Sequence, residues 1–108
     1  MMLPKDELPA CPVEISLFFV GDRWKLLIVR ELLMETKRFG ELKNALGGIS
    51  QKVLTQNLRM MEHHGLVHRE AYAEIPPRVE YSLTETGKSL KIIIDSLWQW
   101  GASWKEEV

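Results

Sequence analysis

The chain has 108 residues, a formal net charge of −1, 45% hydrophobic residues and 27% charged residues, which indicate one globular domain and exclude a disordered chain. The single cysteine, Cys11, excludes a disulfide framework within the chain, and no apolar run approaches the roughly 18 residues that span a bilayer. Residues 1–9 lack the apolar core of a signal peptide, so we expect a cytoplasmic protein.

The first third of the chain predicts a polar arm followed by two helices. Residues 1–10 are polar with two prolines and are expected to form a loose arm. A proline at the first position and Cys11 as the cap predict a helix over residues 12–20. Asp22 is a suitable cap for a second helix over residues 23–34, where apolar residues recur at helical spacing.

The middle of the chain predicts two helices joined by a tight turn. Residues 37–39 suit a connector or one short strand, and residues 40–46 suit a short helix that a Gly-Gly pair ends. Ser50 is a good N-cap for a helix of about four turns over residues 51–64. Two helices joined in this way are typical of a helix-turn-helix.

The last third predicts a β-hairpin and a final helix. Residues 66–74 and 78–83 suit two strands, with the Pro76-Pro77 pair at the tip between them. Thr84 is a suitable cap for a last helix over residues 85–104. The order of elements predicts a mainly α (α+β) fold: one winged helix-turn-helix domain over residues 11–108 with a two-stranded wing.

The helix predicted after Ser50 has one apolar face and one long polar face. Leu54, Leu58 and Met61 are spaced four and three apart and are expected to be buried together. The other face suits DNA, because glutamine reads adenine, arginine reads guanine, and hydroxyl groups near a helix start bind phosphate. The residues that we expect to contact DNA are Lys37, Arg38, Ser50, Gln51, Lys52, Thr55, Gln56, Arg59 and Arg78.

The local charge favours the same interpretation. Between Lys37 and Arg59, five positive side chains and one negative side chain give a net charge of +4 in a chain whose total is −1. The alternative is an ordinary solvated helix face, since exposed polar positions are common. Arg78, just past the proline tip, suits a phosphate or minor-groove contact and equally suits an ion pair with a neighbouring glutamate.

Other functions find less support in the sequence. There is no phosphate-binding glycine loop, metal-ligand motif or nucleophile motif, so we expect neither an enzyme nor a cofactor. His63, His64 and His68 lack further metal ligands nearby and are expected at a helix end or on the surface. The alternative function is a winged helix for protein contacts without DNA binding, which salt-dependent binding to duplex DNA would exclude.

Six stretches of the chain carry a resemblance to a known family: 11–14 (CPVE), 22–25 (DRWK), 37–42 (KRFGEL), 48–59 (GISQKVLTQNLR), 65–67 (GLV) and 76–84 (PPRVEYSLT). In order, from residue 11 to about residue 101, the chain resembles the HxlR-type winged helix-turn-helix regulators. The resemblance implies a homodimeric bacterial transcription factor whose first and last helices form the dimer interface. It also implies a response to electrophiles, oxidants or aldehydes in some members. Gly21-Asp22 replaces the family's frequent Gly-Gly.

A homodimer also has a physical argument. The aromatic content of the first and last helices is large for so small a core, and exposed apolar patches usually mark interfaces. The alternative is a last helix that covers only its own wing and core. A two-fold dimer would place its recognition helices about 34 Å apart, which matches an inverted-repeat operator. The expected interface residues are Phe18, Phe19, Leu97, Trp98 and Trp104.

Cys11 is a candidate sensor. Amide groups at a helix start favour a thiolate, although Glu14 one turn inside opposes this effect. The resemblance implies the same role, because family members with a cysteine at this position use it so. The alternative is a small buried residue at the dimer interface. With one cysteine, a disulfide would join two subunits, or one subunit and a small thiol.

From the whole sequence, the expected partners are duplex DNA, a second copy of the chain and an inducer that the sequence does not identify. We expect no metal and no membrane.

Overall fold

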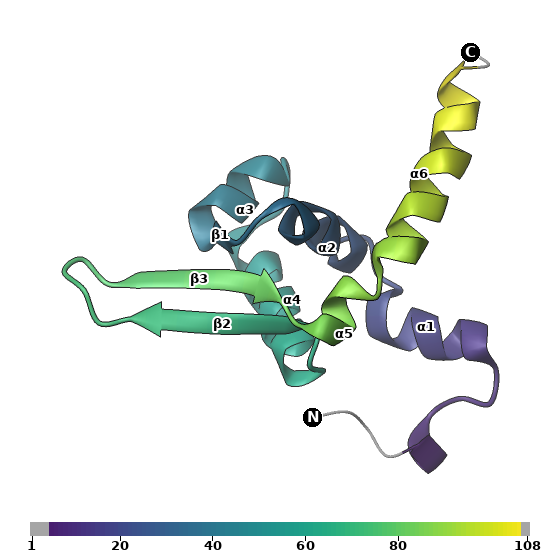
Figure 1. The fold of residues 1–108 in the computed structure, drawn as a ribbon, viewed down its shortest axis with the longest axis horizontal. Helices are drawn as coiled ribbons and strands as arrows, with labels where there is room; N and C mark the ends of the chain where they lie inside the picture. Colours follow the sequence, from purple (N-terminus) through teal and green to yellow (C-terminus); the bar gives the residue numbers. More distant parts are fainter. Residues whose placement is uncertain (1–4, 107–108) are drawn as a thin grey trace.

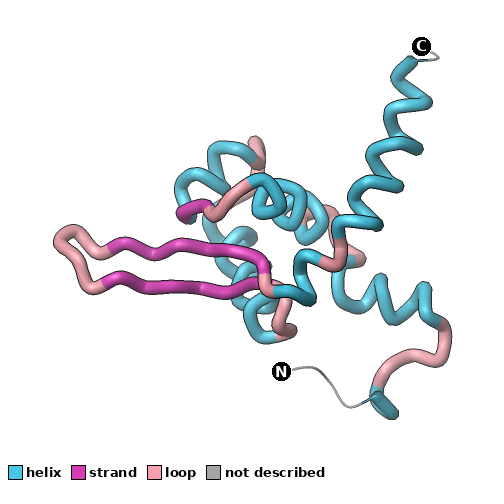
Figure 2. The backbone as a smooth tube through the Cα atoms, in the orientation of Figure 1, coloured by secondary structure: helices cyan, strands magenta, loops and turns pink. Residues whose placement is uncertain are grey.

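The computed structural model describes residues 5–106, in which helices and a small sheet surround one core (Figures 1 and 2). The long hairpin projects to one side, and the last helix projects from the opposite side. In chain order the elements are η1 (Lys5–Glu7), α1 (Pro12–Val20), α2 (Lys25–Met34), β1 (Lys37–Arg38), α3 (Phe39–Ala45), α4 (Gln51–His63), β2 (Val67–Tyr72), β3 (Arg78–Leu83), α5 (Glu85–Lys88) and α6 (Lys91–Glu106).

The core lies where α2, α3 and α4 meet the base of the hairpin. Ile28 of α2, Leu42 of α3 and Leu54 of α4 are fully buried there, and Leu83 closes the core from β3. The three helical residues come from the apolar stripes that helical spacing predicts, so burial of each stripe fixes how its helix is rotated.

The three strands form one antiparallel sheet in the order β1-β3-β2. The hairpin pairs Val67 with Leu83 at its base and Tyr72 with Arg78 near its tip. On the other edge of β3, Lys37 lies opposite Tyr81. The predicted two-stranded wing is confirmed, and the short connector before α3 adds a third strand to its base. With the helix pair α3 and α4, this sheet makes the fold a winged helix-turn-helix, as the sequence predicts.

Two local signals act as predicted, with small changes in boundary. The Asp22 Oδ1 accepts hydrogen bonds from the N–H groups of Trp24 at 3.0 Å and Lys25 at 2.9 Å, so α2 starts at Lys25, two residues later than predicted. Gly48 and Gly65 adopt positive φ angles of 92° and 76° where helices α3 and α4 end, a conformation that glycine adopts without strain.

The prediction of one continuous helix over residues 85–104 is wrong. The Thr84 Oγ1 accepts the Gly87 N–H at 3.0 Å and donates to the Gly65 carbonyl at 2.6 Å, which ties the short α5 to the start of the hairpin. After Ser89 and Leu90 the chain resumes as α6, which packs its first turns against α2 and then extends outward (Figure 1).

The predicted N-terminal arm lies partly outside the described residues, since the description starts at residue 5. Within it, Lys5–Glu7 form a short 3-10 helix. The domain boundary at residue 11 stays a prediction. None of the helices in residues 5–106 combines the length and the apolar character that a membrane crossing needs.

Candidate DNA-binding surface

Helix α4 begins with a side-chain cap and buries one of its faces. The Ser50 Oγ accepts a hydrogen bond from the Val53 N–H at 3.1 Å, which satisfies one amide of the first turn. Leu54, Leu58 and Met61 are buried, as their spacing predicts. The helix is therefore fixed along its apolar face, and its polar face is left to solvent.

The polar face of α4 carries Lys52, Gln56 and Arg59. All three side chains are exposed, and their separations of four and three residues place them on one side of the helix. Within residues 5–106, none of these three side chains forms a hydrogen bond or ion pair. Two unpaired cations and an unpaired amide on one exposed face are able to bind an anionic, hydrogen-bonding partner without breaking internal contacts.

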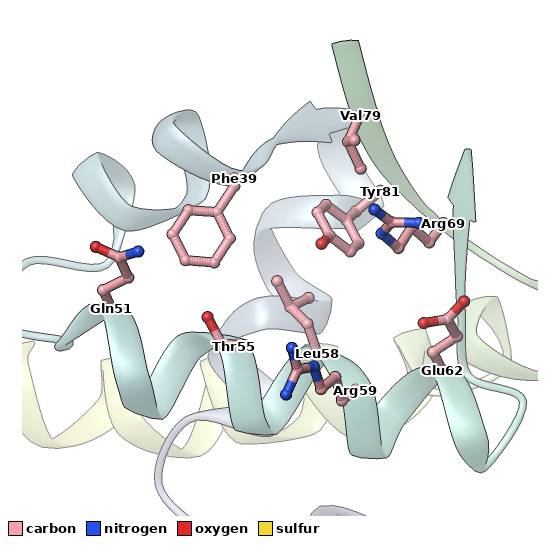
Figure 3. Close-up of a pocket in the computed structure, with 9 residues that line it drawn as sticks. All are labelled: Phe39, Gln51, Thr55, Leu58, Arg59, Glu62, Arg69, Val79 and Tyr81. Atoms are coloured by element: carbon pink, nitrogen blue, oxygen red, sulfur yellow. The ribbon is translucent and has the colours of Figure 1, made fainter. Parts of the chain in front are cut away.

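An open groove of about 540 Å³ separates α4 from the sheet (Figure 3). In Figure 3 the Tyr81 hydroxyl points into the groove, and the Arg69 guanidinium lies beside the Tyr81 ring. Three of the predicted DNA contacts therefore share this groove with residues of the hairpin. The groove is lined by Gln51, Thr55, Leu58, Arg59 and Glu62 of α4, Phe39 of α3, Arg69 of β2, and Val79 and Tyr81 of β3.

The two basic residues before α3 differ in exposure. Lys37 is buried, and its Nζ lies 3.3 Å from a carboxylate oxygen of Glu35, so the expectation of an exposed, DNA-contacting lysine at this position is not supported. Its strand pairing with Tyr81 turns the side chain inward. Arg38 is exposed, and its backbone N–H donates to the Glu41 Oε1 at 2.7 Å.

Arg78 is enclosed by partners from its own hairpin. Its guanidinium donates to Glu74 at 2.7 Å and to Glu80 at 2.6 Å, and it lies 3.8 Å from the centre of the Tyr72 ring. The hydrogen bond from Arg78 lowers the pKa of Glu74, and the two glutamates raise the pKa of Arg78. Of the two alternatives that the sequence leaves open, the structure shows the ion pair.

Two residues of the groove, Arg69 and Tyr81, were not among the predicted contacts. They lie directly opposite each other in the hairpin and on the face turned toward α4. The alternation of side chains along a strand carried the signal, because Tyr81 shares a face with the buried Leu83, and Arg69 shares one with the buried Val67. Arg69 is exposed and has no hydrogen bond or ion pair within the described range 5–106.

Large apolar side chains remain exposed on α1 and α6. Trp98 is 70% exposed, and a shallow groove beside it is lined by residues of α2 and α6, among them Leu27 and Ile94. Phe19 is half-buried. Among the other predicted interface residues, Phe18, Leu97 and Trp104 are exposed, as are Val13, Leu17, Ile92 and Trp100 on the same two helices.

Cys11 is an exposed free thiol and the N-cap residue of α1. Its position at the helix start agrees with the predicted cap, although its side chain forms no capping hydrogen bond. Within residues 5–106, no three histidine, cysteine, aspartate or glutamate side chains gather in a way that could hold a metal ion.

His64 caps the C-terminal end of α4 and is buried beneath α1. The centre of its ring lies 5.2 Å from that of Phe19 and 5.6 Å from that of Phe18, and the residue is 8% exposed. Burial, followed by the charges of His63 and Lys25, holds the pKa of His64 below its ordinary value. The expected position at a helix end is correct, but this end lies inside the protein, where it joins α1 to α4.

The sequence and the fold match known transcription regulators. Residues 19–108 match the family model described as HxlR-like helix-turn-helix. The HTH-type transcriptional regulator YdeP of Bacillus subtilis is 40% identical over 103 residues, which are 95% of this chain and 80% of YdeP.

Two of the similar solved structures are those of a redox regulator and of a transcriptional regulator in its reduced form. The redox regulator HypR in its oxidised form superposes with a TM-score of 0.82 at 43% identity, over 86% of this chain and 96% of HypR. The reduced form of the transcriptional regulator YodB of Bacillus subtilis superposes with a TM-score of 0.76 at 34% identity, over 93% of this chain and 99% of YodB.

Proposed function

The chain belongs to the HxlR-like helix-turn-helix family and is a transcriptional regulator, and from this premise we propose that it binds operator DNA sequence-specifically as a homodimer. The observation that carries the proposal is the exposed polar face of α4, where Lys52, Gln56 and Arg59 have no partners among the described residues 5–106. The fold supports the same function, because a helix-turn-helix presents its second helix to the major groove.

The proposed base contacts come from the first turns of α4. Gln56 reads adenine through its amide, and Arg59 reads guanine through two parallel hydrogen bonds. Lys52 and the Ser50 hydroxyl bind phosphates at the helix start, where the amide groups also favour an anion. Gln51, Thr55 and Arg38 complete the proposed set, whereas Lys37 and Arg78 are left out because glutamates of the same chain already bind them.

The exposed apolar residues of α1 and α6 support the proposed homodimer. Isolated exposed apolar residues are common on a monomer, but tryptophans gathered on one projecting helix are typical of an interface. A second copy that covers Phe18, Leu97 and Trp98 with its own equivalent residues would bury them by two-fold symmetry. The two α4 helices would then read the two halves of an inverted repeat.

Cys11 is the proposed sensor of this regulator. The redox regulator HypR is similar over most of the chain, and the exposed thiol of Cys11 is open to oxidants. Hydrogen peroxide would oxidise the Cys11 thiols of two subunits to one disulfide, taking two electrons and two protons and leaving two molecules of water. Because Cys11 precedes α1, this bond would act on the helix that packs against His64 and the end of α4.

Fluorescence anisotropy with duplex DNA tests the proposed function. The operator is selected from a random duplex library, and its scrambled version is the control, with both titrated at several salt concentrations. We expect tighter binding to the selected duplex and a steep loss of affinity with salt. A protein that binds both duplexes weakly and without salt dependence would instead support the alternative, a winged helix for protein contacts.

Two variants assign the residues. Arg59→Ala should weaken binding to the selected duplex by about 1–3 kcal/mol and reduce discrimination at one guanine. Lys88→Ala is the matched control, because Lys88 is an exposed lysine on α5 that pairs with Glu85.

Peroxide should change the operator affinity of the wild type and leave that of Cys11→Ser unchanged. An equal response of both proteins would exclude Cys11 as the sensor.

A further inference from the structure

The hairpin has two chemically different faces. Arg69 and Tyr81 lie opposite each other and line the groove beside α4, together with Val79. The residues between them along each strand, such as Glu80, point to the opposite face, since side chains alternate along a strand. That outer face carries Glu70 opposite Glu80 and Tyr72 opposite Arg78. The hairpin therefore presents a cationic residue toward α4 and an acidic network away from it.

The groove contains hydrogen-bond donors that nothing in the described chain uses. The guanidinium groups of Arg59 and Arg69 and the Tyr81 hydroxyl have no hydrogen bond or ion pair within residues 5–106. Glu62 also lines the groove, so the two arginines leave it with one net positive charge. Guanidinium and hydroxyl donors of this kind suit phosphate oxygens, which accept several hydrogen bonds at once.

Duplex geometry places a phosphate strand between these two walls. A major groove admits one helix, so when α4 occupies it the hairpin beside α4 meets the sugar-phosphate strand that borders the groove. We expect that strand to pass between the helix and the hairpin. We propose that the groove between α4 and the sheet binds this strand, with Arg69 and the Tyr81 hydroxyl as its phosphate contacts. This inference rests on the proposed function.

The wing tip is a poorer candidate for the same contact. Arg78 is the basic residue nearest the tip, and two carboxylates and the Tyr72 ring already surround it. A phosphate would have to displace a glutamate that carries the same charge as itself. Arg78 therefore stiffens the wing, and Arg69 is the arginine of the wing that binds DNA.

Salt-dependent affinity separates a phosphate contact from a structural role. In anisotropy titrations with the selected duplex and with a random duplex, Arg69→Ala should weaken both complexes by the same factor. It should also reduce the slope of log K against log salt concentration by about 0.9, the value for one lost phosphate contact. Tyr81→Phe should weaken both complexes roughly tenfold and leave the slope unchanged, because it removes a hydrogen bond to a charged group but no charge.

Three further variants are the controls. Arg78→Ala is the matched arginine substitution and should leave the slope unchanged. Arg69→Lys keeps the charge and should keep the wild-type slope, which excludes misfolding as the cause of the Arg69→Ala effect. Glu62→Gln removes the opposing carboxylate and should tighten binding to both duplexes.

The outcomes distinguish this proposal from the proposed function. If the wild type binds the selected duplex specifically and Arg69→Ala has the wild-type slope, the proposed phosphate contact in the groove is wrong and the regulator function stands. A loss of slope in Arg78→Ala in place of Arg69→Ala would move the contact to the wing tip and overturn the proposal in the same way. A wild type that binds no duplex would overturn both.

Discussion

Gly87 lies so close to the start of the hairpin that a side chain has no room. A Cβ atom at this position would come within 2.1 Å of the Leu66 carbonyl oxygen and 3.1 Å of a Leu83 methyl group. The backbone contact is rigid, because the Thr84 cap ties α5 to Gly65. A glycine is therefore required here by packing, although its backbone conformation is an ordinary one.

We predict that Gly87→Ala lowers the free energy of unfolding by about 1–3 kcal/mol, the usual cost of overpacking. Urea denaturation followed by circular dichroism measures the change. Gly40→Ala is the matched control, because a Cβ at Gly40 in helix α3 meets nothing within 4 Å. That substitution should be neutral or stabilising by about 0.5–1 kcal/mol. Equal effects of the two substitutions would contradict the packing argument.

His64 makes the stability depend on pH. Its folded-state pKa is lowered, first by burial and then by the charges of His63 and Lys25. The unfolded chain, with an ordinary histidine pKa of about 6.5, therefore binds the proton more strongly than the folded protein. Stability is complete above that value and is lost as the pH falls below it.

The melting temperature should accordingly fall between pH 7 and pH 5, as measured by differential scanning calorimetry. His64→Phe keeps an aromatic ring beside Phe18 and Phe19 but takes up no proton, so its melting temperature should vary less over this range. His68→Phe removes an exposed histidine from the hairpin and serves as the control. A wild-type pH dependence in His64→Phe would refute the assignment to this residue.

Among the elements, α4 has an N-terminal end with two roles, one in stability and one proposed in DNA binding. Its N-cap hydroxyl stabilises the first turn, and the same hydroxyl is proposed to contact phosphate. A single substitution that removes both roles cannot separate them. Two substitutions at Ser50 can, because the cap requires only an acceptor, whereas a phosphate contact does not tolerate a negative charge.

Ser50→Ala should lower the free energy of unfolding by about 1 kcal/mol and weaken DNA binding. Ser50→Asp should restore the stability, since aspartate is a good N-cap, and should weaken DNA binding further by repelling phosphate. Thermal unfolding and anisotropy titrations on the same samples provide both quantities. If Ser50→Asp bound duplex DNA as tightly as the wild type, the start of α4 would lie away from the phosphates.

The wing and the last helix show how neighbouring elements override local patterns. The last helix of the sequence prediction is interrupted, because Thr84 and Gly87 fix α5 to the hairpin and Leu90 turns inward to the core. The α6 segment then resumes in a direction that leaves its tryptophans exposed (Figure 1). The interruption thus separates the part of the last helix that belongs to the core from the part proposed for the dimer.

For the whole molecule, the exposed apolar residues of α1 and α6 are the strongest sign of a second subunit. Trp98→Glu would place a charge in the proposed interface while leaving the protomer core intact, because the indole is exposed. Sedimentation equilibrium should show a dimer for the wild type and a monomer for Trp98→Glu. The loss of dimer stability should be about 2 kcal/mol or more, as for the tryptophans that dominate other interfaces.

Ile75→Glu is the control for the dimer. Ile75 is a fully exposed apolar residue at the loop of the hairpin, and the hairpin and α6 project to opposite sides of the protein (Figure 1). This variant should sediment as the wild type does. A monomeric wild type, or a dimer that persists in Trp98→Glu, would place the interface elsewhere.

The features that depend on the geometry of one element can be predicted from the amino-acid pattern alone. The spacing of Leu54, Leu58 and Met61 specified the buried face of α4, Ser50 specified its start, and alternation specified the strand 78–83. Helical and strand periods are properties of the backbone, so they can be derived without knowledge of any neighbour. These features sufficed for the fold and for most of the candidate surface.

Which charged side chains are free to bind DNA depends on the folded arrangement of the chain. Lys37 and Arg78 are basic like Arg59, and their glutamate partners lie within four residues of them in the sequence. Nearness along the chain permits such ion pairs but does not decide that they form, since Arg69 has no partner within residues 5–106 although Glu70 is its neighbour in sequence. The burial of Lys37 and the pairing of β2 with β3 decide this, because they set the face on which each side chain lies.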